Sequence, residues 1–270
     1  MQLFSLNNVS LFYGKAPIVR DINITFAEKR VICIIGPSGS GKSTLLRTLN
    51  RMNDLTPSFE CKGSVLFDGH DIYNNGTKVS QLRQHVGMVF QKPCIFPKSI
   101  YDNVLFGVRQ LYRMKKAEHQ QIVEETLKAV YLWGEVKDKL RSSALELSQG
   151  QQQRLTIARA LAVKPRVLLL DEPTSSLDHK SGAAIDALIN NLKGEITVIM
   201  VTHKLDQARR IADDVVFMCD GMICEAGTSK QIFETPGKSE TKCYIKGEEI
   251  NVPIEGFVSS QVIRLKAEGY

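Results

Sequence analysis

The sequence predicts an α/β fold, and three features indicate this class. Within 18–26, Ile22, Ile24 and Phe26 alternate with polar neighbours, which is typical of a half-buried antiparallel strand. The run at 167–170 is continuously apolar, as expected of a strand buried on both faces. Residues 100–112 and 117–132 carry apolar side chains three and four positions apart, which is the spacing of an amphipathic helix.

Composition limits the function classes. The 270 residues are 43% hydrophobic and 24% charged, and Lys plus Arg exceed Asp plus Glu by 35 − 29 = 6 without a dense basic block. This balance does not favour a nucleic-acid partner. The cysteines show no metal-binding spacing and are interpreted as reduced thiols of a cytosolic protein. We expect no signal peptide and no membrane-spanning helix, because apolar runs reach only about the length of a strand, not the roughly 20 residues of a span.

The elements of the first half follow from apolar runs and turn residues. A turn at Tyr13-Gly14-Lys15 separates two expected strands, and a Gly-rich segment separates a third strand from a helix that runs to about Asn53. The strands predicted here are 3–13, 18–26, 31–35, 63–69 and 86–90. From 92 to about 163 the pattern becomes helical, which predicts a helical insertion.

The second half alternates strands and helices before its pattern weakens. The strands predicted here are 167–171, 196–201, 215–218 and 222–225, and the helices are 179–193 and about 204–212. Asp220-Gly221 makes the last two strands a hairpin. From about Thr235 onward the sequence fits either a small β unit, with a strand-like piece at 250–254, or a loose tail.

The most informative stretch connects the 31–35 strand to the next helix. Its glycines let the backbone curl with N–H groups pointing inward, and the following helix directs its positive end to the same place. Lys42 adds a charge for the β- and γ-phosphates, and the Ser43 hydroxyl can ligate Mg²⁺. The nucleotide-binding residues predicted here are Gly36, Pro37, Ser38, Gly39, Ser40, Gly41, Lys42, Ser43 and Thr44.

A phosphate loop that serves nucleotide hydrolysis needs a second site, with acidic residues, to bind magnesium and to activate the attacking water. The apolar 167–170 strand ends in Asp171 and Glu172, so both carboxylates reach the edge of the sheet. Beside a phosphate loop, we expect Asp171 to hold Mg²⁺ and Glu172 to activate water. Without a phosphate loop, the simpler interpretation of this pair would be a strand end capped by solvated acids.

The pentapeptide Leu147-Ser148-Gln149-Gly150-Gln151 opens a helix, with Ser148 as its N-cap. This pentapeptide resembles the signature of ABC ATPases, usually Leu-Ser-Gly-Gly-Gln, and it lies between the phosphate loop and the Asp-Glu strand as in that family. The resemblance covers about residues 1–235. It implies a P-loop NTPase of the ABC type, with a RecA-like mixed-sheet core, an antiparallel β subdomain and a helical subdomain inserted at about 92–163; residues 236–270 would form a C-terminal extension.

The resemblance also implies roles for single residues. Tyr13 matches the aromatic that stacks on adenine, Gln91 the glutamine that touches Mg²⁺ and the attacking water, and His203 the histidine at the γ-phosphate. Residues 175–178, ending in Asp178, match the loop that crosses the dimer interface. Such ATPases work as head-to-tail homodimers, in which Ser148, Gly150 and Gln151 of one copy face the ATP of the other. Gln149 replaces the usual glycine, and since glutamine tolerates positive φ poorly, we expect weakened dimer closure.

Several longer stretches, 49–55, 65–69, 86–93, 96–104 and 151–155, resemble the ATPase subunits of bacterial phosphate importers. This likeness implies an ATPase with ATP and Mg²⁺ as cofactors, peripheral on the cytoplasmic face of the inner membrane. Its expected partners are a second copy, two permease subunits and, indirectly, an extracytoplasmic solute-binding protein. The alternatives are an importer for another small solute, a soluble ABC-type ATPase acting on nucleic acid or ribosomes, and a small-molecule kinase.

Overall fold

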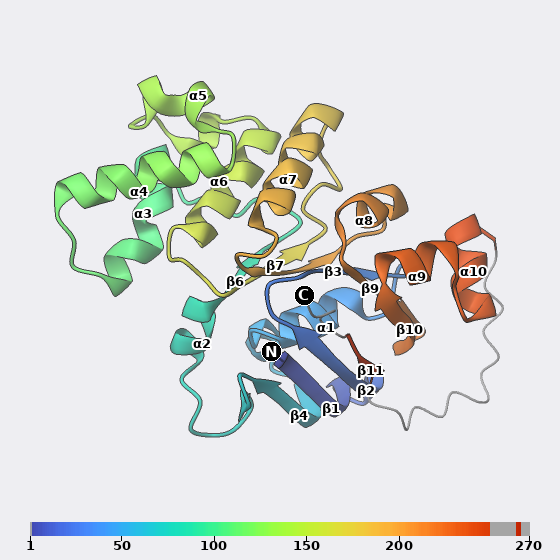
Figure 1. Ribbon diagram of the computed structural model, residues 1–270. Coiled ribbons are helices and arrows are strands. Elements are labelled where there is room, and N and C mark those ends of the chain that lie inside the picture. Colours follow the sequence, from blue (N-terminus) through green and yellow to red (C-terminus); the bar gives the residue numbers. More distant parts are fainter. Residues whose placement is uncertain (1, 249–262, 266–270) are drawn as a thin grey trace.

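A computed structural model describes residues 2–248 and 263–265, in which two β-sheets are combined with two groups of helices (Figure 1). The larger sheet has six strands in the order β10-β9-β3-β8-β7-β6. Strands β9, β3, β8, β7 and β6 are parallel, and β10 pairs antiparallel with β9 as the predicted hairpin. Their bounds are β3 Val31–Ile35, β6 Val86–Val89, β7 Val167–Asp171, β8 Thr197–Val201, β9 Asp214–Cys219 and β10 Met222–Thr228.

The smaller sheet has five strands in the order β11-β2-β1-β4-β5. It is antiparallel except for β11, which pairs parallel with β2. The bounds are β1 Gln2–Tyr13, β2 Ala16–Ala27, β4 Phe59–Phe67, β5 His70–Asp71 and β11 Ile263–Arg264. The two sheets together confirm the predicted α/β class with a mixed sheet and an antiparallel part.

The parallel strands separate two apolar cores, which explains their continuous apolar runs. On β3, Val31, Cys33 and Ile35 belong to one core, whereas Ile32 and Ile34 belong to the other. The first core lies between the sheet and the helices, and the second is shared with the smaller sheet and with helix α1 (Lys42–Thr48). Because both faces are covered, the middles of these strands are apolar, and their buried polar residues Asp171, Thr197 and Asp214 stand at strand ends.

The insertion predicted between the strands is helical, and it confirms the expected architecture. Its helices gather at the upper left of Figure 1, away from β1, β2 and β4. They are α3 Ile100–Leu111, α4 Lys116–Ala129, α5 Trp133–Val136 and α6 Gln149–Leu161, with the short 3₁₀ turns Lys137–Lys139 and Ala144–Glu146. On the sheet itself lie α7 His179–Leu192 and α8 Leu205–Ile211. No helix in the described part of the chain is long and apolar enough to cross a bilayer.

Several elements differ from the sequence-based expectation. Helix α1 ends at Thr48 instead of continuing to Asn53, which lies in the 3₁₀ turn Met52–Leu55. Helices α2 (Val79–His85) and α9 (Ser229–Glu234) were not predicted. Both have only a few residues, too short to show a helical period in the sequence.

After residue 235 the described residues form a helix that the sequence did not suggest, and the two-residue strand β11 on the smaller sheet. Ser239–Lys246 forms helix α10, and Glu225 anchors its start by accepting the N–H groups of Gly237 (2.7 Å) and Lys238 (3.2 Å). The Tyr244 ring stacks on Phe217 of β9, with 4.9 Å between ring centroids. Tertiary contact with the core therefore makes residues 239–246 a docked helix, while the strand-like piece 250–254 lies outside the described residues.

Candidate nucleotide-binding site

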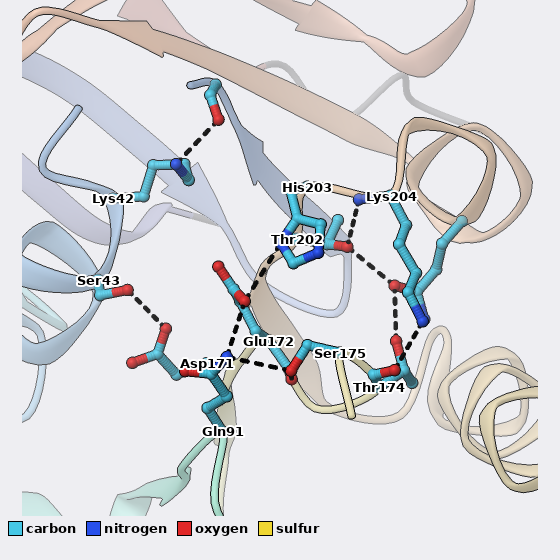
Figure 2. A network of polar contacts seen from close by, with 12 residues as sticks. Lys42, Ser43, Gln91, Asp171, Glu172, Thr174, Ser175, Thr202, His203 and Lys204 are labelled. Carbon is cyan, nitrogen blue, oxygen red and sulfur yellow. Dashed lines mark hydrogen bonds and ion pairs between the residues drawn. The ribbon is translucent and has the colours of Figure 1, made fainter. Parts of the chain in front are cut away.

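Adjacent parallel strands bring the predicted site residues to one edge of the larger sheet. Strands β3, β8, β7 and β6 are neighbours, so their carboxyl ends lie side by side. The segments that leave these ends are the Gly-rich loop after β3, His203 after β8, Glu172 after β7 and Gln91 after β6. Figure 2 shows these side chains facing a common space.

Backbone geometry explains the glycines of the loop between β3 and α1. Gly36 has a φ of 146°, and a Cβ atom there would collide with the carbonyl oxygen of Met218 on β9. Gly41, just before α1, has a φ of 87°, and its Cβ would lie 2.9 Å from the carbonyl oxygen of Ile18. A side chain at either position would therefore displace the loop from the sheets that support it.

Lys42 folds back over this loop. Its Nζ donates to the carbonyl oxygens of Gly36 (2.9 Å) and Pro37 (2.7 Å), and the residue is only 7% exposed. Burial lowers the pKa of Lys42, and the nearby carboxylates of Glu172 and Asp171 oppose that shift. A buried ammonium group with two carbonyl partners is ready to exchange them for an anion, which would neutralise its charge.

Asp171 lies opposite the loop and is 2% exposed. One carboxylate oxygen accepts a hydrogen bond from the Ser43 hydroxyl at 2.7 Å (Figure 2), and the other accepts one from the Arg47 guanidinium at 2.9 Å. A carboxylate and a hydroxyl in contact are hard oxygen ligands, the type that Mg²⁺ prefers when it also binds substrate phosphates. These two residues therefore fit the predicted magnesium site. Arg47, which the sequence did not single out, balances the Asp171 charge.

The Glu172 carboxylate is the centre of the polar contacts at the strand ends. One of its oxygens lies 3.2 Å from Gln91 Nε2 and 3.2 Å from His203 Nδ1. Gln91 also donates to Ser175 Oγ at 3.2 Å. The backbone of Glu172 has a φ of 46°, an uncommon conformation for a residue with a side chain. The three predicted catalytic residues therefore form one contact group.

Tyr13 is held near the Gly-rich loop by hydrogen bonds that lead to helix α1. Its hydroxyl donates to Asn53 Oδ1 at 3.0 Å, and Asn53 Nδ2 donates in turn to the carbonyl oxygen of Thr44 at 2.9 Å. The half-buried ring packs on Phe59, with 5.6 Å between centroids. These contacts hold the ring beside α1, while adenine stacking stays a prediction.

The remaining predicted residues form a second cluster, where α6 and α7 begin. Ser148 caps α6 in a capping box with Gln151: Ser148 Oγ accepts the Gln151 N–H, and Gln151 Oε1 accepts the Ser148 N–H at 3.0 Å. Asp178 caps α7, and hydrogen bonds from Ser181 hold its pKa below the usual range. A Cβ at Gly150 would collide with Ser181, so glycine permits this approach of α6 to α7. Ser148, Asp178 and Ser181 line a cavity of about 450 Å³.

The premise that Gln149 occupies a position of positive φ is wrong. Gln149 is the first residue of α6 and does not have a positive φ. Its side chain instead donates from Nε2 to Ser176 Oγ at 2.9 Å. Glutamine is therefore unstrained here, and it connects the start of α6 to the loop before Asp178.

Replacing Gln149 with Gly is therefore expected to destabilise the protein. The variant loses the Ser176 hydrogen bond and places glycine in a helix, for a total cost of about 1 kcal/mol in the free energy of unfolding. Urea unfolding measures this quantity, and Gln149→Ala separates the two causes because it removes only the hydrogen bond. A Gln149→Gly variant that is more stable than the wild type would instead show that glutamine strains the backbone.

Comparisons with known proteins agree with this geometry. The profile of the ABC transporter family matches residues 19–175. The chain is 49% identical over 92% of its length to the phosphate import ATP-binding protein PstB 3 of Streptococcus pneumoniae serotype 4, of which 99% is covered. It is 48% identical over 91% of its length to the phosphate import ATP-binding protein PstB 2 of Bacillus subtilis strain 168, of which 91% is covered.

Solved structures agree on the fold. The structure of cbiO1 from Clostridium perfringens, part of the ABC transporter complex cbiONQ, superposes with a TM-score of 0.76 and 29% identity over 87% of this chain and 91% of that one. A bacterial Atm1-family ABC exporter with ATP bound superposes with a TM-score of 0.73 and 26% identity, covering 86% of this chain and 39% of that one. The chain therefore belongs to the ABC transporter family, as one of its ATP-binding proteins.

Proposed function

We propose that this chain hydrolyses ATP as the motor subunit of an ABC importer for inorganic phosphate. Phosphate is proposed as the substrate because the chain is 49% identical, over nearly its whole length, to proteins named for phosphate import. The transported ion would not contact this subunit, so none of its own side chains identifies the ion. What its own residues support is the hydrolysis of ATP.

The site residues would divide the reaction between them. Lys42 and the N–H groups of residues 36–44 would hold the phosphates, with Tyr13 against the base. Glu172 would take a proton from the attacking water, while Gln91 and His203, both 3.2 Å from its carboxylate, would orient that water and the γ-phosphate. Ser43 and Asp171, with Gln91 near them, would hold Mg²⁺, whose charge neutralises the phosphate oxygens.

We infer that two copies complete each site. Ser148 and Asp178 are exposed, and their hydrogen bonds in the described chain are made within the α6–α7 cluster rather than to the phosphate loop. The N-terminal end of α6, where Ser148 is exposed, would meet the ATP of a second copy through Ser148, Gly150 and Gln151. ATP would then hold the two copies together until hydrolysis releases them.

The rest of the proposal concerns the complex. Two permease subunits would sit above the dimer on the cytoplasmic face of the inner membrane, contacting the segment after Gln91, and a solute-binding protein would deliver phosphate from outside. The ATPase unit would span residues 1–235, with the helical subdomain at about 92–163 and an extension at 236–270. Docked helix α10 supports a structural role for the beginning of that extension.

Phosphate uptake tests the proposal. The chain and the permease proteins encoded beside it are expressed in cells that lack their own importer ATPase, and the wild type is compared with Lys42→Ala. Phosphate uptake that requires Lys42 is expected. If uptake is absent while the purified protein hydrolyses ATP, phosphate is the wrong solute, and uptake of other small solutes is then measured in the same cells.

A further inference from the structure

A buried glutamine on α8 joins three segments that surround the candidate site. Gln207 is 3% exposed, and its amide oxygen accepts hydrogen bonds from Thr202 Oγ1 at 2.9 Å and from Thr174 Oγ1 at 3.2 Å. Its amide nitrogen donates to Asp186 Oδ1 on α7 at 2.6 Å. Thr202 precedes His203, and Thr174 lies two residues after Glu172.

Lys204 adds a second connection between the same segments. Its backbone N–H donates to Thr202 Oγ1 at 3.1 Å, and its Nζ donates to the carbonyl oxygen of Thr174 at 2.6 Å (Figure 2). The segment that carries His203 is thus tied to the loop 174–178 by side-chain and backbone groups. That loop ends at Asp178, the N-cap of α7.

These hydrogen bonds lie beside a groove between α7 and α8. The groove has a volume of about 760 Å³ and is lined by Asp178 and Lys204, and the Asp186–Arg210 ion pair (2.8 Å) joins the two helices along it. A buried amide costs free energy unless its partners satisfy it, so an apolar side chain would be the simpler choice for packing alone. A buried amide whose oxygen and nitrogen both have partners at this junction indicates that the relative position of the segments matters.

We propose that Gln207 is a positioning residue, which fixes the His203 segment relative to the loop 174–178 so that a shift of His203 at the γ-phosphate is passed to Asp178. This inference rests on the proposed function, because Asp178 would meet the second copy of the chain. Gln207 does not touch the nucleotide in this scheme. It would transmit the occupancy of one ATP site, sensed by His203, to Asp178 at the interface with the second copy, where the other ATP site is completed.

The substitution Gln207→Glu removes the hydrogen bond to Asp186 and keeps the two hydrogen bonds from the threonines. Glutamate keeps an acceptor for both threonines, but it places a carboxylate against Asp186 and so repels α7. We expect kcat for ATP hydrolysis to fall about 10-fold or more, as for a slightly misplaced catalytic group. The KM for ATP should stay within about 2-fold, because the residues that hold the phosphates are untouched. The double variant Gln207→Glu with Asp186→Asn restores a donor–acceptor pair and should recover most of the lost kcat.

The chain offers a matched control on α4. Gln121 Nε2 donates to Glu125 Oε1 at 2.7 Å on an exposed helix face, so Gln121→Glu creates the same amide-to-carboxylate change away from the site. It should leave kcat and KM unchanged. If Gln207→Glu does not fold, Gln207→Met keeps a similar side-chain volume without any of the hydrogen bonds and should lower kcat in the same way.

The outcomes separate this inference from a purely structural role and from the proposed function. Wild-type kcat in Gln207→Glu or Gln207→Met, or a fall that only follows the folded fraction in a thermal melt, or no recovery in the double variant, overturns the inference. A different result would contradict the proposed ATP-dependent dimer: the wild-type ATPase rate per protomer would not change with protein concentration.

Discussion

Replacing Glu172 with Gln is expected to stop ATP turnover while ATP still binds. Glutamine keeps the shape of the side chain but cannot accept a proton from water. Loss of a general base costs about 10²- to 10⁴-fold in rate. Gln91 and His203 both contact this side chain at 3.2 Å, which is why we expect Glu172 to act as the base. With hydrolysis blocked, the ATP-bound dimer should accumulate.

Two measurements check this result. Steady-state phosphate release gives the rate, and size-exclusion chromatography with light scattering gives the mass with and without ATP. Glu234→Gln, an exposed carboxamide substitution at the end of α9, serves as the control and should behave as the wild type. A Glu172→Gln protein that turns over ATP normally and stays a monomer would contradict both the assigned base and the dimer.

Replacing Lys42 with Ala is expected to weaken ATP binding itself. The variant loses charge-assisted hydrogen bonds to the phosphates, each contributing about 1.5–3 kcal/mol, so the Kd should rise at least roughly 10-fold. Lys42→Arg should not restore binding, because the planar guanidinium does not match the space that a buried ammonium occupies between two carbonyl groups of the loop.

Isothermal titration calorimetry with ATP measures this Kd directly. The control is Lys230→Ala, at an exposed position on α9. The free energy of unfolding without ATP should change little in Lys42→Ala, because removing a buried charge offsets the loss of its carbonyl partners. An unchanged Kd for ATP would remove Lys42 from the binding site.

The sequence alone determined the parts of this protein that depend on local chemistry. A strand followed by glycines, lysine and serine specifies a phosphate loop, since only glycine permits the backbone conformations at Gly36 and Gly41. The apolar run that ends in Asp171 and Glu172 likewise specified a strand that delivers two acids to the sheet edge. The order of these motifs predicted the fold class and the residues that meet at the strand ends.

The tertiary structure decided what depends on contacts between distant segments. Helix α10 forms where the sequence suggested a β unit or a tail, because Tyr244 stacks on Phe217. Gln149 was expected to be strained, yet it is the first residue of α6 after the Ser148 cap, and its side chain has a partner in Ser176. Arg47 and Gln207 belong to no sequence motif, since Arg47 binds Asp171 and Gln207 binds Thr174 and Asp186, all distant in the sequence. A hydrogen bond between residues distant in sequence leaves no periodic or compositional trace, so it becomes visible only once the chain has folded.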